Sequence, residues 1–120
     1  MFSKFLLPGI LLALTLGIGL WVSLAGKPYK GILFNLHKLL ALWTVVLFGI
    51  LVYRELQSAP PAASVVALLV LVGICILALF ATGALMSIGT PEYRLELIIH
   101  RFALILLPIA MIGSFLLLKE

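Results

Sequence analysis

Residues 63–88 read ASVVALLVLVGICILALFATGALMSI, an apolar stretch without a single charged side chain. A helix needs about 20 mostly apolar residues to cross the hydrocarbon core of a bilayer, so this segment is long enough to span it. Three further stretches are also long and mostly apolar, although two of them carry a few charged residues: residues 5–25, 29–53 and 91–118. We therefore predict an all-α fold: one integral membrane domain, residues 1–120, forming an up-down bundle of four transmembrane helices with both termini on the same side.

The composition agrees with this assignment. Apolar residues of the AVILMFWYC set make up 65% of the chain, charged residues make up 10%, and the mean hydropathy is +1.36. Soluble domains are about 45–50% apolar and about 25% charged, and a chain this short cannot bury such an excess. These values exclude a soluble enzyme and a disordered tail, and the single cysteine, Cys75, excludes a disulfide scaffold. We expect contact with a lipid bilayer, in a bacterial inner (cytoplasmic) membrane.

The charges are few and scattered. The formal net charge is +4, but no basic face or run exists, so we expect no nucleic-acid partner. Residues 5–25 could also be a cleaved signal peptide, yet the apolar run is too long and we expect a retained span. Eight basic residues flank the spans, five near the loops at residues 26–30 and 89–94 and three on the other side: Lys27, Lys30, Lys38, Arg94 and Arg101, against Lys4, Arg54 and Lys119. This excess favours a cytoplasmic location for the two loops.

A similar turn precedes the second and the fourth span. Gly26-Lys27-Pro28 is followed by His37-Lys38, and Gly89-Thr90-Pro91 is followed by His100-Arg101. Glycine, proline, histidine and the next basic residue all recur at an offset of 63 residues. Glycine suits the left-handed residue that closes a helix, and proline suits the first turn of the next. The pattern predicts two similar helical hairpins.

His37 and His100 are the only two histidines. A titratable side chain inside a span is costly and therefore indicates function by default. Because each histidine lies nine residues after its proline, we expect both imidazoles about 13 Å below the start of their helices. On the diagonal of an up-down bundle they would be about 11–14 Å apart. That gap suits a flat macrocycle whose metal takes one imidazole from each face; the alternative is two packed polar residues, each hydrogen-bonded to a neighbouring helix.

Other metal sites fit the sequence less well. Zinc prefers four ligands, and Glu96, one turn before His100, is the only carboxylate at a matching depth. Copper sites usually recruit Cys or Met, and Cys75 lies away from the level of the histidines. The chain has no C-x-x-C-H motif for covalent attachment of haem. Non-covalent haem b with two axial histidines needs no further ligand.

Small and basic residues near the histidines are further candidates for cofactor binding. Gly19 and Gly83 are expected to let a macrocycle approach the helix backbone closely. Lys38, Arg101 and Arg94 are candidate partners of the haem propionates. The alternative for the basic residues is snorkelling to the membrane interface, which is the favoured interpretation for Lys27 and Lys30.

The pattern resembles the small membrane b-type cytochromes of the cytochrome b561 and ferric-reductase-like kind. In that architecture a four-helix core holds haem between histidines on alternate helices, and the resemblance covers nearly the whole chain through His37, His100 and their spacing. It implies that these residues are the axial pair of a single haem. Cytochromes of the b561 kind carry a second pair on the other two core helices, whereas spans 5–25 and 63–88 contain no histidine. A single haem implies a partner subunit or a quinone to complete electron transfer.

Three functions fit these residues to different degrees. The leading hypothesis is an electron-transfer subunit of a membrane redox complex, which is not an enzyme by itself. The alternative is a pigment-binding or anchor and assembly subunit of a larger membrane complex without haem, whose histidines ligate chlorophyll-type magnesium or only pack. A small multidrug exporter is the weakest hypothesis, because such proteins rely on an acidic residue in the first span and residues 5–25 contain none.

Overall fold

The structure is a computed structural model that describes residues 3–26, 31–89 and 91–118. They form four long helices: α1 (Ser3–Ala25), α2 (Ile32–Ser58), α3 (Ala63–Ile88) and α4 (Tyr93–Leu118). The described part of the chain contains no β-strand. Each helix is long and apolar enough to cross a membrane. The prediction of an all-α membrane protein with four transmembrane helices is therefore confirmed.

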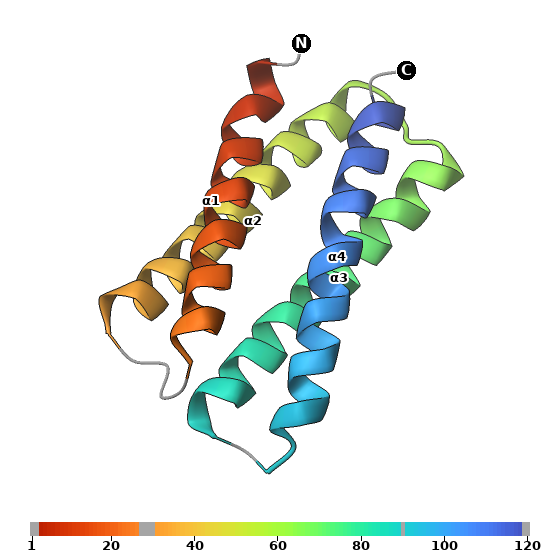
Figure 1. Cartoon of the computed structure of the whole chain (residues 1–120). Coiled ribbons are helices and arrows are strands. Elements are labelled where there is room, and N and C mark those ends of the chain that lie inside the picture. The colour runs from red at the N-terminus through yellow and green to blue at the C-terminus, as the bar shows by residue number, and fades with distance from the viewer. Residues whose placement is uncertain (1–2, 27–30, 90, 119–120) are drawn as a thin grey trace. The chain divides into compact units, whose positions relative to one another are not determined.

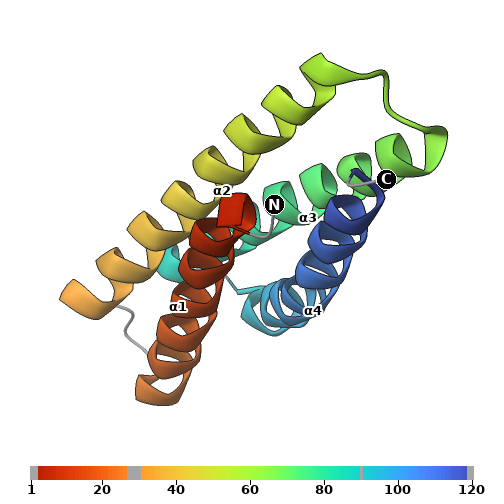
Figure 2. The ribbon, with the colours of Figure 1, turned by 90° about the horizontal axis from the view of Figure 1, so that it is seen from above.

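The chain forms two compact units, each a helical hairpin. The N-terminal hairpin comprises Met1–Ala59 and the C-terminal hairpin comprises Pro60–Glu120. In both views α1 lies beside α2 with the chain running in the opposite direction, and α3 lies beside α4 in the same way (Figures 1 and 2). The two hairpins predicted from the repeated turn are thus present.

A left-handed glycine ends the first helix of each hairpin. Gly26 has a φ of 76° and Gly89 has a φ of 73°. The N–H of Gly26 donates to the carbonyl oxygen of Val22 at 3.2 Å, which closes the last turn of α1. Residues with a Cβ rarely adopt this conformation, so glycine is required at both positions and this element of the repeat is confirmed. Three other residues of the predicted turns lie outside the described residues: Lys27, Pro28 and Thr90.

Helix boundaries differ from the sequence prediction at four places, of which the first is the start of α1, at Ser3 instead of residue 5. α2 continues to Ser58 instead of ending at Tyr53. The Arg54-Glu55 pair ends the apolar stretch but not the helix, because Arg, Glu, Leu and Gln are all good helix formers. α2 begins at Ile32, after residue 29, and α4 begins at Tyr93, after residue 91.

Each hairpin buries a narrow stripe between its helices. In the N-terminal hairpin Thr44, Phe48 and Val52 form the buried face of α2, at the four-residue spacing that keeps side chains on one side of a helix. In the C-terminal hairpin Ser114 is fully buried and Ala110 nearly so. Small residues of this kind let helices approach closely inside a bilayer, where apolar burial gives no driving force.

Large apolar side chains cover the outward faces of the helices. Leu24, Leu77 and Ile88 are more than 70% exposed, at 79%, 72% and 73%. Water would make such continuous apolar surface highly unfavourable, whereas lipid tails accept it. Exposed apolar surface of this kind suits contact with a lipid bilayer, as expected for an integral membrane protein.

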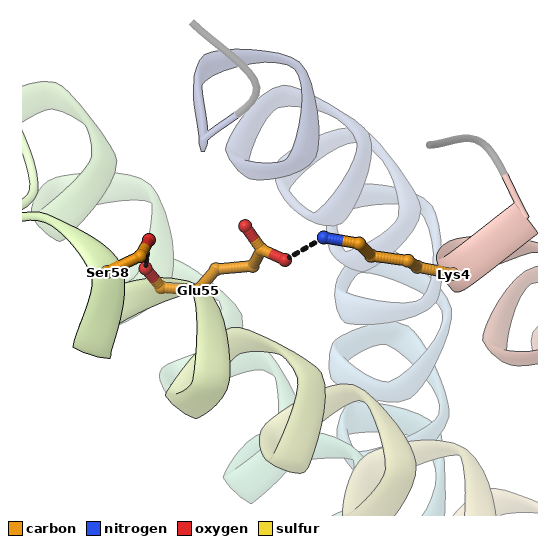
Figure 3. A network of polar contacts seen from close by, with 3 residues as sticks. All are labelled: Lys4, Glu55 and Ser58. Carbon is orange, nitrogen blue, oxygen red and sulfur yellow. Dashed lines mark hydrogen bonds and ion pairs between the residues drawn. The ribbon is translucent and has the colours of Figure 1, made fainter.

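An ion pair joins α1 and α2 at the end of the N-terminal hairpin remote from its loop (Figure 3). Lys4 Nζ lies 2.6 Å from Glu55 Oε1. The hydroxyl of Ser58 donates to the backbone oxygen of Glu55 at 2.7 Å, in the last turn of α2. Because α2 continues beyond Tyr53, Glu55 is in place to form an ion pair with Lys4 at the start of α1.

Replacing Lys4 with methionine is expected to lower the free energy of unfolding by at most about 1 kcal/mol, because exposed ion pairs contribute roughly 0.2–1 kcal/mol. The measurement is reversible unfolding in mixed micelles at low and high salt, and the difference from wild type should shrink as salt rises. Glu55→Gln is the matched variant, and the double variant should lose no more than either single one. Losses that simply add would show that the two side chains do not interact.

Candidate functional site

His37 projects from α2 onto α1. Its Nδ1 lies 3.0 Å from the backbone oxygen of Thr15. A carbonyl oxygen can only accept a hydrogen bond, so Nδ1 carries the hydrogen and Nε2 carries the lone pair. A Cβ added to Gly19 would lie 2.7 Å from Cε1 of His37 and 3.1 Å from its Nδ1. The absence of a side chain at Gly19 is what leaves room for the imidazole.

His100 is held in a similar way in the C-terminal hairpin. Its Nδ1 lies 2.8 Å from the hydroxyl oxygen of Thr82 on α3. That hydroxyl donates its one hydrogen to the carbonyl oxygen of Ala78 at 2.6 Å, so it accepts the hydrogen of Nδ1. His100 therefore has the same tautomer as His37, with the lone pair on Nε2. A Cβ on Gly83 would lie 3.5 Å from Cε1 of His100, an ordinary van der Waals distance.

We call each imidazole, together with the glycine and the oxygen that it contacts on the neighbouring helix, a histidine seat. The two seats have the same arrangement. In each, an imidazole from the second helix packs on a glycine of the first and donates from Nδ1 to an oxygen of that helix. The repeat spaces the histidines by 63 residues and these glycines by 64. Neither contact follows from the Gly-Pro turn that first indicated the repeat. The likeness of the hairpins therefore extends from the loops to the packing of the histidines.

The seats also differ. The oxygen that holds His37 belongs to the backbone, whereas the oxygen that holds His100 belongs to a threonine side chain. Glu96 is buried one turn before His100, and the residue at the corresponding place before His37 is Leu33. The C-terminal seat is thus the more polar of the two.

The histidines lie nearer the helix ends than predicted. His37 comes five residues after the first residue of α2, Ile32, and His100 comes seven residues after the first of α4, Tyr93. At 1.5 Å per residue these positions are about 7.5 Å and about 10.5 Å along their helices, not about 13 Å. The correction follows from the later start of both helices. Both seats therefore belong to the loop ends of their hairpins.

A pair of buried hydroxyls fixes the register of α1 against α2 below His37. Thr15 Oγ1 and Thr44 Oγ1 are 3.3 Å apart. Each hydroxyl oxygen also lies 2.7 Å from a carbonyl oxygen one turn earlier in its own helix, that of Leu11 or Leu40. Because a hydroxyl has one hydrogen, one threonine donates to the other, which in turn donates to its own carbonyl. Inside a bilayer the hydrophobic effect does not drive helices together, so polar contacts of this kind help to stabilise their packing. They place the Thr15 carbonyl where His37 can reach it.

Gly19 and Gly83 contact the histidines of their own hairpins. The sequence singled them out for their small size, and the structure shows what their size accommodates within each hairpin, an imidazole ring. Their expected contact with a macrocycle stays a prediction.

The basic candidates are exposed. Lys38 Nζ lies 4.2 Å from the centroid of the Phe34 ring, one turn nearer the loop, which is the direction expected for a snorkelling lysine. Arg94, in the first turn of α4, and Arg101, directly after His100, are also exposed. Pairing of these three residues with propionates stays a prediction. Lys27 and Lys30 lie outside the described residues.

Two contributors were not predicted from the sequence, the Thr15 carbonyl and the Thr82 hydroxyl. The only signal for Thr82 was its place beside Gly83, and a backbone carbonyl leaves no signal at all. Within residues 3–26, 31–89 and 91–118, no three His, Cys, Asp or Glu side chains come together as a metal-binding group. Comparison of the chain with known family models, with curated proteins and with solved structures finds no match.

Proposed function

We propose that this protein is an electron-transfer subunit of a membrane redox complex and that it binds one haem b, with His37 and His100 as the two axial ligands. The observation that carries the proposal is the common state of the imidazoles. His37 donates from Nδ1 to the carbonyl oxygen of Thr15, and Nδ1 of His100 lies 2.8 Å from the hydroxyl oxygen of Thr82, which can accept from it. A neutral imidazole that donates from Nδ1 has its lone pair on Nε2. Metal-ligating histidines almost always donate their other N–H in this way, which fixes both the tautomer and the ring orientation.

The available donors suit a macrocycle. A porphyrin supplies four equatorial nitrogens, so its iron needs only two further ligands, and each hairpin offers one imidazole. Bound haem would supply iron that changes between the ferrous and ferric states, with both axial positions filled and none left for oxygen or substrate. The chain would therefore transfer electrons and would not itself be an enzyme.

The surroundings of the histidines would influence the iron through charge and burial. Lys38 and Arg101 directly follow the two ligands, and their positive charges would favour the reduced iron and raise the reduction potential. Both side chains are exposed, and solvation of their charges would weaken that effect. The other elements of the proposal are a partner subunit or a quinone as the second electron carrier, and a bacterial inner membrane with the hairpin loops on the cytoplasmic side.

A specific observation favours a second candidate function. Each histidine obtains its hydrogen bond and its glycine contact within its own hairpin. Such a seat suits a chlorophyll-type magnesium, which takes one histidine, as well as it suits one half of a haem site. In this alternative the protein is a pigment-binding subunit with one pigment on each hairpin.

The absorption spectrum of the purified protein distinguishes the two functions. We expect an intense Soret band that shifts on reduction with dithionite, together with sharp α and β bands of a ferrous six-coordinate haem. Strong red absorption with no change on reduction would favour the chlorin alternative. Protein that stays colourless when produced with an ample supply of haem would contradict the proposed function.

A further inference from the structure

We infer that Thr82 is a positioning residue that sets how strongly His100 donates electrons to its metal, and thereby lowers the reduction potential of the site. The inference rests on the proposed haem function. It concerns a residue that touches neither the iron nor the macrocycle in the proposal and that acts only through His100.

A chain of two hydrogen bonds connects His100 to the backbone of α3. Nδ1 of His100 donates to Thr82 Oγ1 at 2.8 Å, and Thr82 Oγ1 donates to the carbonyl oxygen of Ala78 at 2.6 Å. Thr82 is only 5% exposed, so water does not compete freely for its hydroxyl. A hydroxyl that donates is polarised and becomes a better acceptor, so the second bond strengthens the first.

The hydrogen bond at Nδ1 changes how strongly His100 donates electrons to a metal. An acceptor at Nδ1 withdraws that hydrogen from the ring and raises the basicity of Nε2. A more basic axial ligand stabilises ferric iron more than ferrous iron, which lowers the reduction potential. Hydrogen bonds of this kind are among the means by which a protein tunes a haem.

The two hairpins differ in the kind of oxygen that holds the histidine. His37 obtains the same support from the backbone carbonyl of Thr15, so no substitution of Thr15 removes the acceptor itself. The support of His100 comes from the side chain of Thr82, so a single substitution can remove it. Ser114 of the same hairpin is also buried and also donates to a carbonyl four residues earlier, so its hydroxyl provides a matched control that contacts neither histidine.

The test is redox potentiometry of haem-loaded protein. Thr82→Val keeps the side-chain shape and removes the acceptor. We expect it to shift the ferric–ferrous equilibrium about fivefold to tenfold toward the ferrous form, as expected for loss of one hydrogen bond. For one electron this is a rise of about 40–60 mV. Thr82→Ser keeps a hydroxyl and should retain the wild-type potential, and Ser114→Ala, which removes a buried hydroxyl that contacts neither histidine, should leave the potential unchanged.

A second measurement does not depend on haem. The ¹⁵N NMR signals of the imidazoles in haem-free protein report which nitrogen carries the hydrogen. We expect the Nδ1–H tautomer for both histidines in wild type and in Thr82→Ser. In Thr82→Val, His100 should show a mixture of tautomers while His37 stays unchanged.

The outcomes separate this inference from the proposed function. If wild type gives a bis-histidine haem spectrum but Thr82→Val has the wild-type potential, the tuning role is wrong and the haem site stands. If Ser114→Ala shifts the potential as much as Thr82→Val does, the effect is not specific to the hydroxyl that contacts His100. If wild type binds no haem, the proposed function fails, and the NMR measurement still decides whether Thr82 holds His100.

Discussion

His37→Ala and His100→Ala are each expected to abolish the six-coordinate low-spin haem spectrum, since either change leaves the iron with only one imidazole. The remaining haem should be five-coordinate and high-spin, with a broadened Soret band and no sharp α band after reduction. The measurement is a reduced-minus-oxidised spectrum of each purified variant beside wild type.

Imidazole in the buffer is the control for this experiment. Alanine leaves a space next to Gly19 or Gly83, so free imidazole should enter and restore the low-spin spectrum in a variant whose fold is intact. Far-UV circular dichroism checks that the helices remain. A six-coordinate spectrum that persists in either variant without added imidazole would mean that the ligand assignment is wrong.

Gly19→Ala is expected to disrupt the His37 seat, whereas Gly83→Ala is expected to preserve the His100 seat. The added Cβ would lie 2.7 Å from Cε1 of His37 in the first case and 3.5 Å from Cε1 of His100 in the second. The first distance is a steric overlap, so His37 must swing away and lose its bond to the Thr15 carbonyl. Overpacking of this kind costs about 1–3 kcal/mol, so haem affinity should fall by roughly one to two orders of magnitude.

The same substitution in the two helices makes the comparison well matched. Alanine favours a helix over glycine by up to about 1 kcal/mol in both places, so helix propensity cannot explain a loss at one position alone. Affinity is measured by haem titration of the haem-free variants. Equal losses for Gly19→Ala and Gly83→Ala would contradict the difference between the two seats, and so would no loss for either.

The seats are assembled from contacts within the protein alone. Each imidazole has its hydrogen bond and its glycine contact without a cofactor. Their orientation therefore does not have to be established at the moment of binding, which reduces the entropy lost by the side chains. Such preorganisation suits a metal ligand, although a histidine that only packs between helices needs a hydrogen bond for its N–H as well.

The spans and the turns were predictable because their causes are local. The apolar run at residues 63–88 forms α3 with those same bounds. Gly26 and Gly89 adopt the left-handed conformation that their place after an apolar helix requires. The end of α2 was misplaced because Arg54 and Glu55 report where the membrane ends, whereas the helix continues wherever its backbone can stay hydrogen-bonded.

The histidine seats were predictable only in part. A histidine inside a span indicates function whatever surrounds it, so His37 and His100 could be selected from the sequence. Their partners depend on the register between two packed helices, which side-chain shapes and the Thr15–Thr44 contact decide. The sequence marks Gly19 as small but does not say that an imidazole occupies the space beside it.

Titration of the haem-free protein with haem, followed by absorption and by EPR of the ferric form, tests the central claim most directly. We predict saturation at one haem per chain and a single low-spin signal of bis-histidine iron at the end point. Saturation at two haems per chain with high-spin iron would contradict the claim, because each hairpin would then bind its own macrocycle through one histidine.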